Sequence, residues 1–188
     1  GSNGMTYDAP TILSGTIDDE GSGFGAVSFA YPVNGIQNGP DGVALVCNGV
    51  VIEFLSYEGS FMAVGGPADG MMSTDIGVSE DGGTLVGESL QRTGTGCPSS
   101  SFGGMTPMPE SPGSLNMMQV FDPMACAMTN PGVAPFVRIT EIHYDNDGTD
   151  SGEFIEVSGT AGFDLSTCEL VLYNGANSMT YGMMSLSG

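Results

Sequence analysis

The sequence has no lysine, no tryptophan and a single histidine, and its two basic residues are Arg92 and Arg138. Against them stand 22 acidic residues, so the net charge is -20. Because proteins hold nucleic acids mainly through lysine and arginine, this balance excludes nucleic-acid binding. The same scarcity excludes attraction to anionic lipid surfaces. Such an acidic surface repels itself unless cations screen it, which favours salt-rich or calcium-rich extracellular surroundings.

Long apolar runs are also lacking. None approaches the ~20 residues that a membrane-spanning helix needs, so we expect no membrane insertion. The chain begins Gly1-Ser2-Asn3-Gly4 rather than with methionine, from which we expect a processed or excerpted piece of a longer protein. No C-x-x-C spacing is present, so a zinc site is not expected.

Four cysteines are present, Cys47, Cys97, Cys126 and Cys168. An even number is compatible with two disulfides in an oxidising, extracellular compartment, and three pairings are possible. Four free buried thiols are the alternative, because a chain of 188 residues exceeds the size at which small domains depend on disulfides.

Signals for β-strands recur along a glycine-rich chain, whereas helical periodicity is poor. The segment Cys47–Val50 contains Asn-Gly, which predicts a tight type I′ hairpin. Short strands separated by turn residues are typical of a β-sandwich or barrel. The predicted strands are 25–31, 42–47, 50–57, 84–92, 137–143, 153–158 and 169–173.

Residues 98–135 are rich in Ser, Gly, Pro and Met and have weak periodicity. Within them, Asp122–Pro135 reads as a linker, because its prolines remove ladder hydrogen bonds and favour an extended backbone. Pliable methionines in and beside it predict an interface, with Met117, Met118 and Met124 as its expected contacts.

The two ends of the chain resemble each other. Met5-Thr6-Tyr7 returns as Met179-Thr180-Tyr181, and Leu13-Ser14-Gly15 returns as Leu186-Ser187-Gly188. The first pair lies 174 residues apart and the second 173. This echo predicts an internal repeat whose length nearly equals that of the chain.

The segment Val137–Gly175, with Glu-Ile-His-Tyr-Asp at 141–145 and Glu-Phe-Ile-Glu-Val at 153–157, resembles the opening of a lamin-tail domain of the bacterial and algal extracellular type. Residues 5–121 resemble the remainder of that domain, through stretches such as Asn34–Val46 and Gly66–Glu80. The two parts therefore stand in inverted order. A mid-repeat excerpt of a tandem array accounts for this inversion, and a circular permutation is the alternative.

The resemblance implies an all-β, immunoglobulin-like β-sandwich of the lamin-tail type, split across repeat boundaries, with no catalytic chemistry. Residues 1–121 are then the carboxyl-terminal part of one repeat, 122–136 the linker, and 137–188 the amino-terminal part of the next. Where the family stands beside secreted nucleases, the nuclease is a separate domain, so we expect no enzyme here.

Acidic residues cluster at Asp145, Asp147, Asp150 and Glu153, within a glycine-containing loop. Calcium takes six to eight oxygen ligands, which such a loop can supply, although its spacing is not that of an EF-hand. The sequence predicts either a calcium site or a solvated loop. His143 has no neighbouring nucleophile motif, and we expect it to be structural.

Half a sandwich cannot bury its apolar face alone, so we expect copies of the chain to meet head to tail. A Cys97–Cys126 bond would hold the linker, and Cys168 would pair with Cys47 of another copy. The expected function is an extracellular filament, stalk or surface layer; the alternative is a non-catalytic binding or adhesion module of a secreted hydrolase or adhesin. The strand residues expected at the interface are Val137, Ile139, Ile142, Phe154, Ile155, Val157, Leu170 and Leu172.

Overall fold

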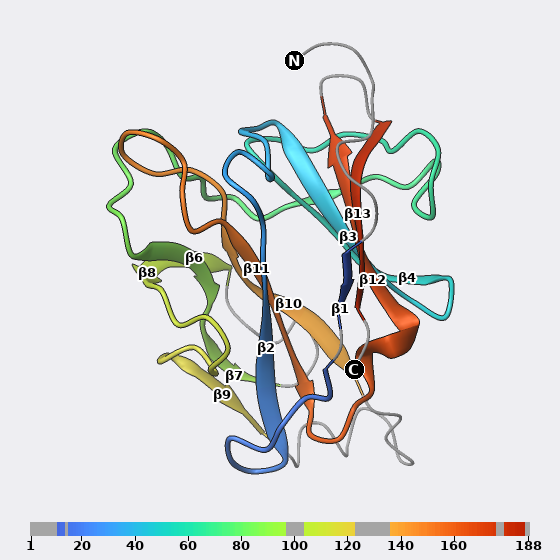
Figure 1. Cartoon of the computed structure of the whole chain (residues 1–188), viewed down its shortest axis with the longest axis vertical. Helices are drawn as coiled ribbons and strands as arrows, with labels where there is room; N and C mark the ends of the chain where they lie inside the picture. The colour runs from blue at the N-terminus through green and yellow to red at the C-terminus, as the bar shows by residue number, and fades with distance from the viewer. Residues whose placement is uncertain (1–10, 14, 97–103, 123–135, 176–178, 187–188) are drawn as a thin grey trace.

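Two β-sheets pack face to face in the computed structural model, which describes residues 11–13, 15–96, 104–122, 136–175 and 179–186 (Figure 1). One sheet has six strands in the order β1-β13-β12-β3-β4-β5, and the other has five in the order β2-β11-β10-β6-β8. A small sheet pairs β7 with β9. The predicted all-β sandwich is confirmed. Among the described residues, no helix has the length and apolar character to cross a membrane.

The elements in chain order are β1 (Thr11–Leu13), β2 (Phe24–Ala30), β3 (Asp41–Cys47), β4 (Val50–Tyr57), β5 (Thr74–Asp75), β6 (Glu88–Arg92), β7 (Gly94–Gly96), β8 (Met105–Pro109), β9 (Gln119–Phe121), β10 (Val137–His143), β11 (Phe154–Thr160), the short 3-10 helix η2 (Leu165–Thr167), β12 (Cys168–Asn174) and β13 (Met179–Leu186). All seven predicted strands are present, although β6 begins four residues later than expected. The Asn-Gly hairpin joins β3 to β4, with φ angles of 51° at Asn48 and 72° at Gly49.

Strands β8 and β9 lie in the segment where the sequence predicted little structure. Strand β8 contains Pro107 and Pro109 and occupies the edge of the five-stranded sheet. An edge position tolerates proline because a strand needs ladder hydrogen bonds on one side only there. The prolines that obscured this strand in the sequence therefore agree with its place in the sheet.

The two parts assigned to different repeats pair with each other within this one chain. Strand β12 lies antiparallel to β3 from Cys168↔Cys47 to Asn174↔Asp41, and β11 lies antiparallel to β2 from Phe154↔Ala30 to Thr160↔Phe24. Strand β10 joins β11 to β6. Residues 137–174 therefore supply inner strands to both sheets, and the sandwich closes without a second copy.

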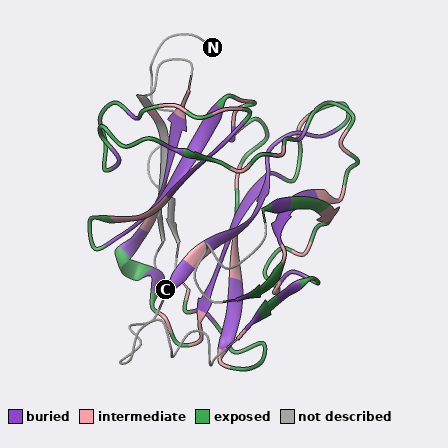
Figure 2. Ribbon diagram, turned by 180° about the vertical axis from the view of Figure 1, so that it is seen from behind, coloured by how far each residue is buried: buried purple, intermediate pink, exposed green. Residues whose placement is uncertain are grey.

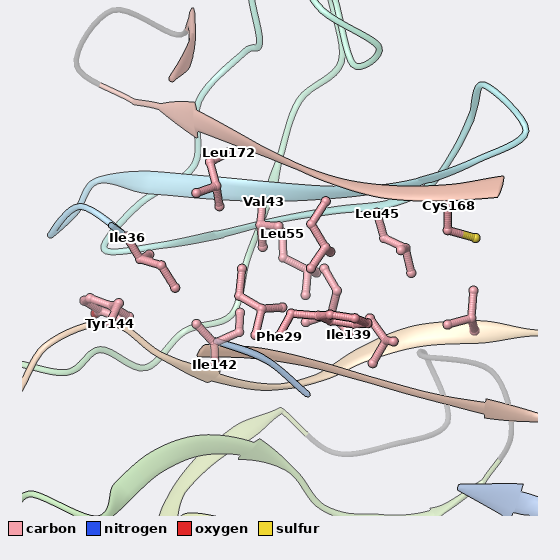
Figure 3. Packing of buried hydrophobic residues seen from close by; sticks show 14 of the residues in the cluster. Phe29, Ile36, Val43, Leu45, Leu55, Ile139, Ile142, Tyr144, Cys168 and Leu172 are labelled. Atoms are coloured by element: carbon pink, nitrogen blue, oxygen red, sulfur yellow. The ribbon is translucent and has the colours of Figure 1, made fainter. Parts of the chain in front are cut away.

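The main core fills the space between the sheets (Figures 2 and 3). Seven of the strand residues that were expected to meet another copy lie in this core at 2% exposure or less: Val137, Ile139, Ile142, Ile155, Val157, Leu170 and Leu172. The eighth, Phe154, is 3% exposed and is buried outside this cluster. Figure 3 shows Ile139 and Ile142 facing Val43, Leu45 and Leu55 of the opposite sheet. Their burial corrects the expectation that these strands need a neighbour, because the amino-terminal part of the same chain covers them.

At a β-bulge in β10, hydrogen bonds and an ion pair connect the two sheets. The register against β11 shifts between Ile139 and Glu141. At this point the Ile139 N–H donates to a Glu53 carboxylate oxygen from the other sheet, and the Ile139 carbonyl accepts from Arg92 Nε at 2.8 Å. Arg92 also pairs with Glu53 at 3.1 Å, and both side chains are largely buried. Burial raises the pKa of Glu53, and Arg92 opposes that rise.

We predict that Arg92→Met lowers the free energy of unfolding by about 3–5 kcal/mol, because it leaves the Glu53 charge buried without its cation. Chemical denaturation at neutral pH measures the change. Arg138→Met is the comparison variant, since the Arg138 charge also lowers the pKa of Glu53, but its Nη1 donates to the carbonyl of adjacent Val137 rather than to that carboxylate. An equal loss in both variants would show that total charge, rather than the bridge, sets the effect.

Candidate functional site

The acidic loop between β10 and β11 does not gather its four carboxylates around one point. Asp145 Oδ2 accepts from Asn38 Nδ2 at 3.0 Å, and the Asp150 carboxyl contacts that of Asp145. Asp147 is exposed. Glu153 is buried, and its two oxygens accept the N–H groups of Asn34 and Ile36, each at 2.7 Å. Within the described residues, no group of three or more His, Cys, Asp or Glu is arranged to hold a metal ion.

Asp145 and Asp150 form the acidic centre that remains in this loop. Burial, together with the hydrogen bond and charge of Asp150, raises the pKa of Asp145 to about 6. Two carboxyls this close disfavour ionising together. A bound cation would relieve their repulsion, so this pair is where a calcium ion would gain most.

Glu80 anchors the base of the same loop and was not identified from the sequence. Its oxygens accept from His143 Nδ1 at 2.9 Å, from the Tyr144 N–H at 2.6 Å and from the Asp145 N–H at 3.0 Å. Burial lowers the pKa of His143, but the hydrogen bond and charge of Glu80 outweigh it and raise the pKa overall. His143 is therefore a buried structural partner of Glu80 in this structure.

A surface cavity of about 190 Å³ opens beside this network. Its lining includes Glu80, Asp81, Thr84 and Glu88. Three carboxylates in so small a space disfavour anionic ligands, in keeping with the composition of the whole chain.

A second acidic pair lies on the outer face of the five-stranded sheet, at the bulge in β10. Glu141 and Glu156 stand directly opposite each other on β10 and β11, and both are fully buried. The bulge turns both Thr140 and Glu141 away from the core while Ile139 and Ile142 face it. The loop after β8 covers the pair, because Ser111 donates to Glu141 at 2.9 Å and the Gly113 N–H donates to Glu156 at 2.9 Å.

The two buried carboxyls have unequal sets of hydrogen-bond donors. Glu141 accepts from Ser89 Oγ, Gln91 Nε2 and both the N–H and Oγ of Ser111. Burial raises the pKa of Glu141, and these donors oppose the rise. Glu156 has fewer donors, and burial together with the Glu141 charge raises its pKa to about 9. At neutral pH the proton therefore resides on Glu156.

This pair predicts a defined pH dependence of stability. The folded chain holds a proton on Glu156 up to about pH 9, whereas the unfolded chain releases it near the ordinary value of 4.5. The contribution of Glu156 to the free energy of unfolding should therefore be fully present below pH 4.5 and be lost as the pH rises from 4.5 to about 9. Glu156→Gln removes the titration, and its amide oxygen can still accept from the Gly113 N–H. We therefore expect the free energy of unfolding of the variant to exceed that of the parent chain by about 1–3 kcal/mol at pH 9.

Urea denaturation between pH 5 and pH 9 measures this difference. Glu110→Gln provides the control, because Glu110 is exposed and lies next to the same loop. If Glu156→Gln and the parent chain show the same slope of stability against pH, the proton is not held there.

One of the predicted disulfide pairs forms, but within the chain. Cys47 and Cys168 are directly opposite on β3 and β12 and are bonded, closing a sequence separation of 121 residues. The expectation that Cys168 would bond to Cys47 of another copy was therefore wrong. Cys97, Cys126 and Met124 lie outside the described residues. A disulfide fits an oxidising compartment, in agreement with the expected extracellular location.

Large apolar side chains are exposed at several places among the described residues, and two sets of them contain methionines. Met117 is 78% exposed, and Met118 and Val120 beside it are also exposed. The second group lies on the hairpin after β4, where Met62 and Met72 form an antiparallel bridge. Val64 and Met71 are exposed on this hairpin as well. The interface predicted at Met117 and Met118 therefore stays a prediction, with both side chains exposed.

Strands β1 and β13, which lie near the two ends of the chain, pair side by side in the six-stranded sheet (Figure 1). Strand β1 runs parallel to β13 with the pairs Thr11↔Met184, Ile12↔Ser185 and Leu13↔Leu186. Each pair is 173 residues apart, which is the separation of the Leu-Ser-Gly copies in the sequence. The repeat itself stays a prediction from the sequence.

Comparison with protein-family models, with curated proteins and with solved structures finds no match for the chain. By its fold, the chain is an all-β sandwich with a disulfide between β3 and β12. The lamin-tail resemblance and its immunoglobulin-like topology stay predictions from the motifs.

Proposed function

We propose that the chain is a non-enzymatic, extracellular structural module that assembles with copies of itself head to tail into a filament, stalk or surface layer. The observation that carries this proposal is that the two ends of the chain, whose sequences repeat Met-Thr-Tyr and Leu-Ser-Gly, meet as β1 and β13 at one edge of the six-stranded sheet. Ends that repeat each other can take equivalent places in successive units.

The use of the buried carboxylates supports a structural role. Glu53, Glu80, Glu141, Glu153 and Glu156 each accept at least one backbone N–H from a distant segment. Each therefore holds a loop or strand in place. Resistance to deformation, which such bonds provide, suits a load-bearing module.

The charge sets the conditions for assembly. Copies that each carry a charge of -20 repel one another at low ionic strength. Screening at 0.15 M salt, where the Debye length is about 8 Å, removes most of the repulsion between exposed groups. Assembly should therefore need salt or divalent cations.

The alternative function, a binding or adhesion module of a secreted protein, is favoured by the exposed hairpin side chains Met62, Val64, Met71 and Met72. Flexible methionine surfaces adapt to varied partners. In this case the chain would remain monomeric and use the hairpin for its partner.

We predict that the purified chain forms larger species as its concentration rises, and that added salt promotes them. Sedimentation velocity over a concentration series, with negative-stain electron microscopy of the same samples, measures this. Monomers at every concentration and ionic strength would contradict assembly and leave adhesion as the better function.

We further propose that calcium at Asp145 and Asp150 stiffens the module. Calcium should raise the melting temperature at pH 7, and Asp150→Asn should abolish the rise, because it removes one of the two touching carboxyls. Glu169→Gln is the control, since it removes one charge from β12, away from this loop. An unchanged calcium effect in Asp150→Asn would place the ion elsewhere.

A further inference from the structure

Asn-Gly pairs occur in the described part of the chain at Asn34, Asn38, Asn48 and Asn174. Asparagine is chemically labile, because the backbone nitrogen that follows it can attack its side-chain amide. A following glycine favours this attack, since it has no Cβ to crowd the nitrogen. The local sequence thus gives these pairs the same intrinsic lability, and differences between them come from the fold.

The pair Asn174-Gly175 is held at both of its reacting groups. Asn174 Nδ2 donates to Gln37 Oε1 at 2.6 Å, and the Gly175 N–H donates to Asp41 Oδ1 at 2.8 Å. The backbone is crowded as well, because a Cβ placed on Gly175 would lie 2.0 Å from the Pro40 carbonyl oxygen. An attack here has to break both hydrogen bonds and displace this neighbour, which lowers its rate.

The two pairs in the loop before β3 are each held at one reacting group. In Asn34-Gly35, the glycine N–H donates to the Pro32 carbonyl at 2.7 Å. In Asn38-Gly39, the asparagine Nδ2 donates to Asp145 Oδ2 at 3.0 Å. A Cβ placed on this glycine would lie 2.7 Å from the Glu58 Cβ, so the backbone has little room to turn. The fold therefore restrains both pairs.

The pair Asn48-Gly49 differs from the other three. It forms the turn between β3 and β4, and both residues are exposed. The Asn48 backbone N–H donates to the Thr167 carbonyl at 2.8 Å, but within the described structure no hydrogen bond engages the Asn48 side chain or the Gly49 N–H. A Cβ placed on Gly49 would meet no atom within 4 Å. The amide, the attacking nitrogen and the space for their approach are all available.

We infer that Asn48 is a site of spontaneous deamidation in the folded chain, with water as the one co-reactant. The Gly49 nitrogen bonds to Asn48 Cγ, the Cγ–Nδ2 bond breaks, and ammonia leaves with the proton from the Gly49 N–H. Closing this ring within one turn is an intramolecular step, which proximity favours. Water then opens the cyclic imide at either carbonyl and yields aspartate or isoaspartate.

The products change the molecule beside its disulfide. Each adds one negative charge to a chain whose net charge is -20. Isoaspartate also carries the backbone through the side-chain carbon, which lengthens the turn between the paired residues Cys47 and Val50. Cys47 is bonded to Cys168, so the altered turn stays attached to β12. The modified chain is therefore expected to remain folded and to differ mainly in charge and in the shape of this hairpin.

Ageing of the folded chain at mildly alkaline pH in water enriched in heavy oxygen tests the site. Digestion with chymotrypsin in ordinary water then separates oxygen gained during ageing from oxygen gained afterwards, and tandem mass spectrometry locates each product. We expect Asn48 to react about tenfold or more faster than Asn34, Asn38 and Asn174, because the fold holds the other pairs by hydrogen bonds or packing. In urea the four rates should converge. Electron-transfer fragmentation should find both aspartate and isoaspartate at position 48.

Matched variants complete the test. Asn48→Gln should lose the main acidic product in ion-exchange chromatography, because a glutamine would have to close a larger ring. Asn34→Gln is the control, since Asn34 is also exposed, also has a positive φ and also precedes a glycine. Thermal melts before ageing establish that both variants are folded. The inference is overturned if another of these asparagines reacts as fast in the folded chain, if aspartate forms at position 48 without isoaspartate, or if Asn48→Gln ages like the parent chain.

Discussion

The loops of this sandwich are fixed by acidic side chains that accept backbone N–H groups. Two oxygens of Glu153 hold the turn at Asn34 and Ile36, and Glu80 holds the start of the acidic loop after β10. Charge-assisted bonds of this kind are stronger than those between neutral groups, and they satisfy buried carboxylates without a cation. A chain with only two arginines needs that solution. Acidic side chains also hold the segment after β8, through Glu141 at Ser111 and Glu20 at Leu115, and the protonated Glu156 holds Gly113 as a neutral acceptor.

The outer face of each sheet is also covered, in addition to the core between the sheets. On the six-stranded sheet an apolar cluster, including Phe54, Ala63, Ala68 and Tyr173, lies beneath the hairpin after β4. Tyr173 fixes that hairpin, since its hydroxyl accepts the Ala68 N–H at 2.9 Å. The cover of the five-stranded sheet is polar instead. One cover is therefore held mainly by apolar burial, and the other by a network whose charge state depends on pH.

The strands could be predicted because their signals are local. Alternating apolar residues and the Asn-Gly turn define β3 and β4 without reference to the rest of the chain. The partner of each strand could not be predicted in the same way. Pairing of β12 with β3 joins residues 121 positions apart, and the repeat suggested that the partner belonged to another copy.

The acidic sites, like the strands, could be predicted from the sequence only in part. Four carboxylates in one loop are visible in the sequence, but Glu153 could not be assigned to the turn at Asn34 without the fold. Glu141 and Glu156 carried one usable signal, the interrupted alternation between Ile139 and Ile142. A bulge explains that interruption, and it places an acid against the opposite strand.

The closed sandwich changes the argument for assembly. Unburied apolar faces cannot drive it, because residues 137–174 complete both sheets from within and the Cys47–Cys168 bond secures the closure. What remains is the edge beyond β12, where β13 pairs with β1 through three residues. A unit closed in this way is stable by itself, so folding and assembly can be separate steps.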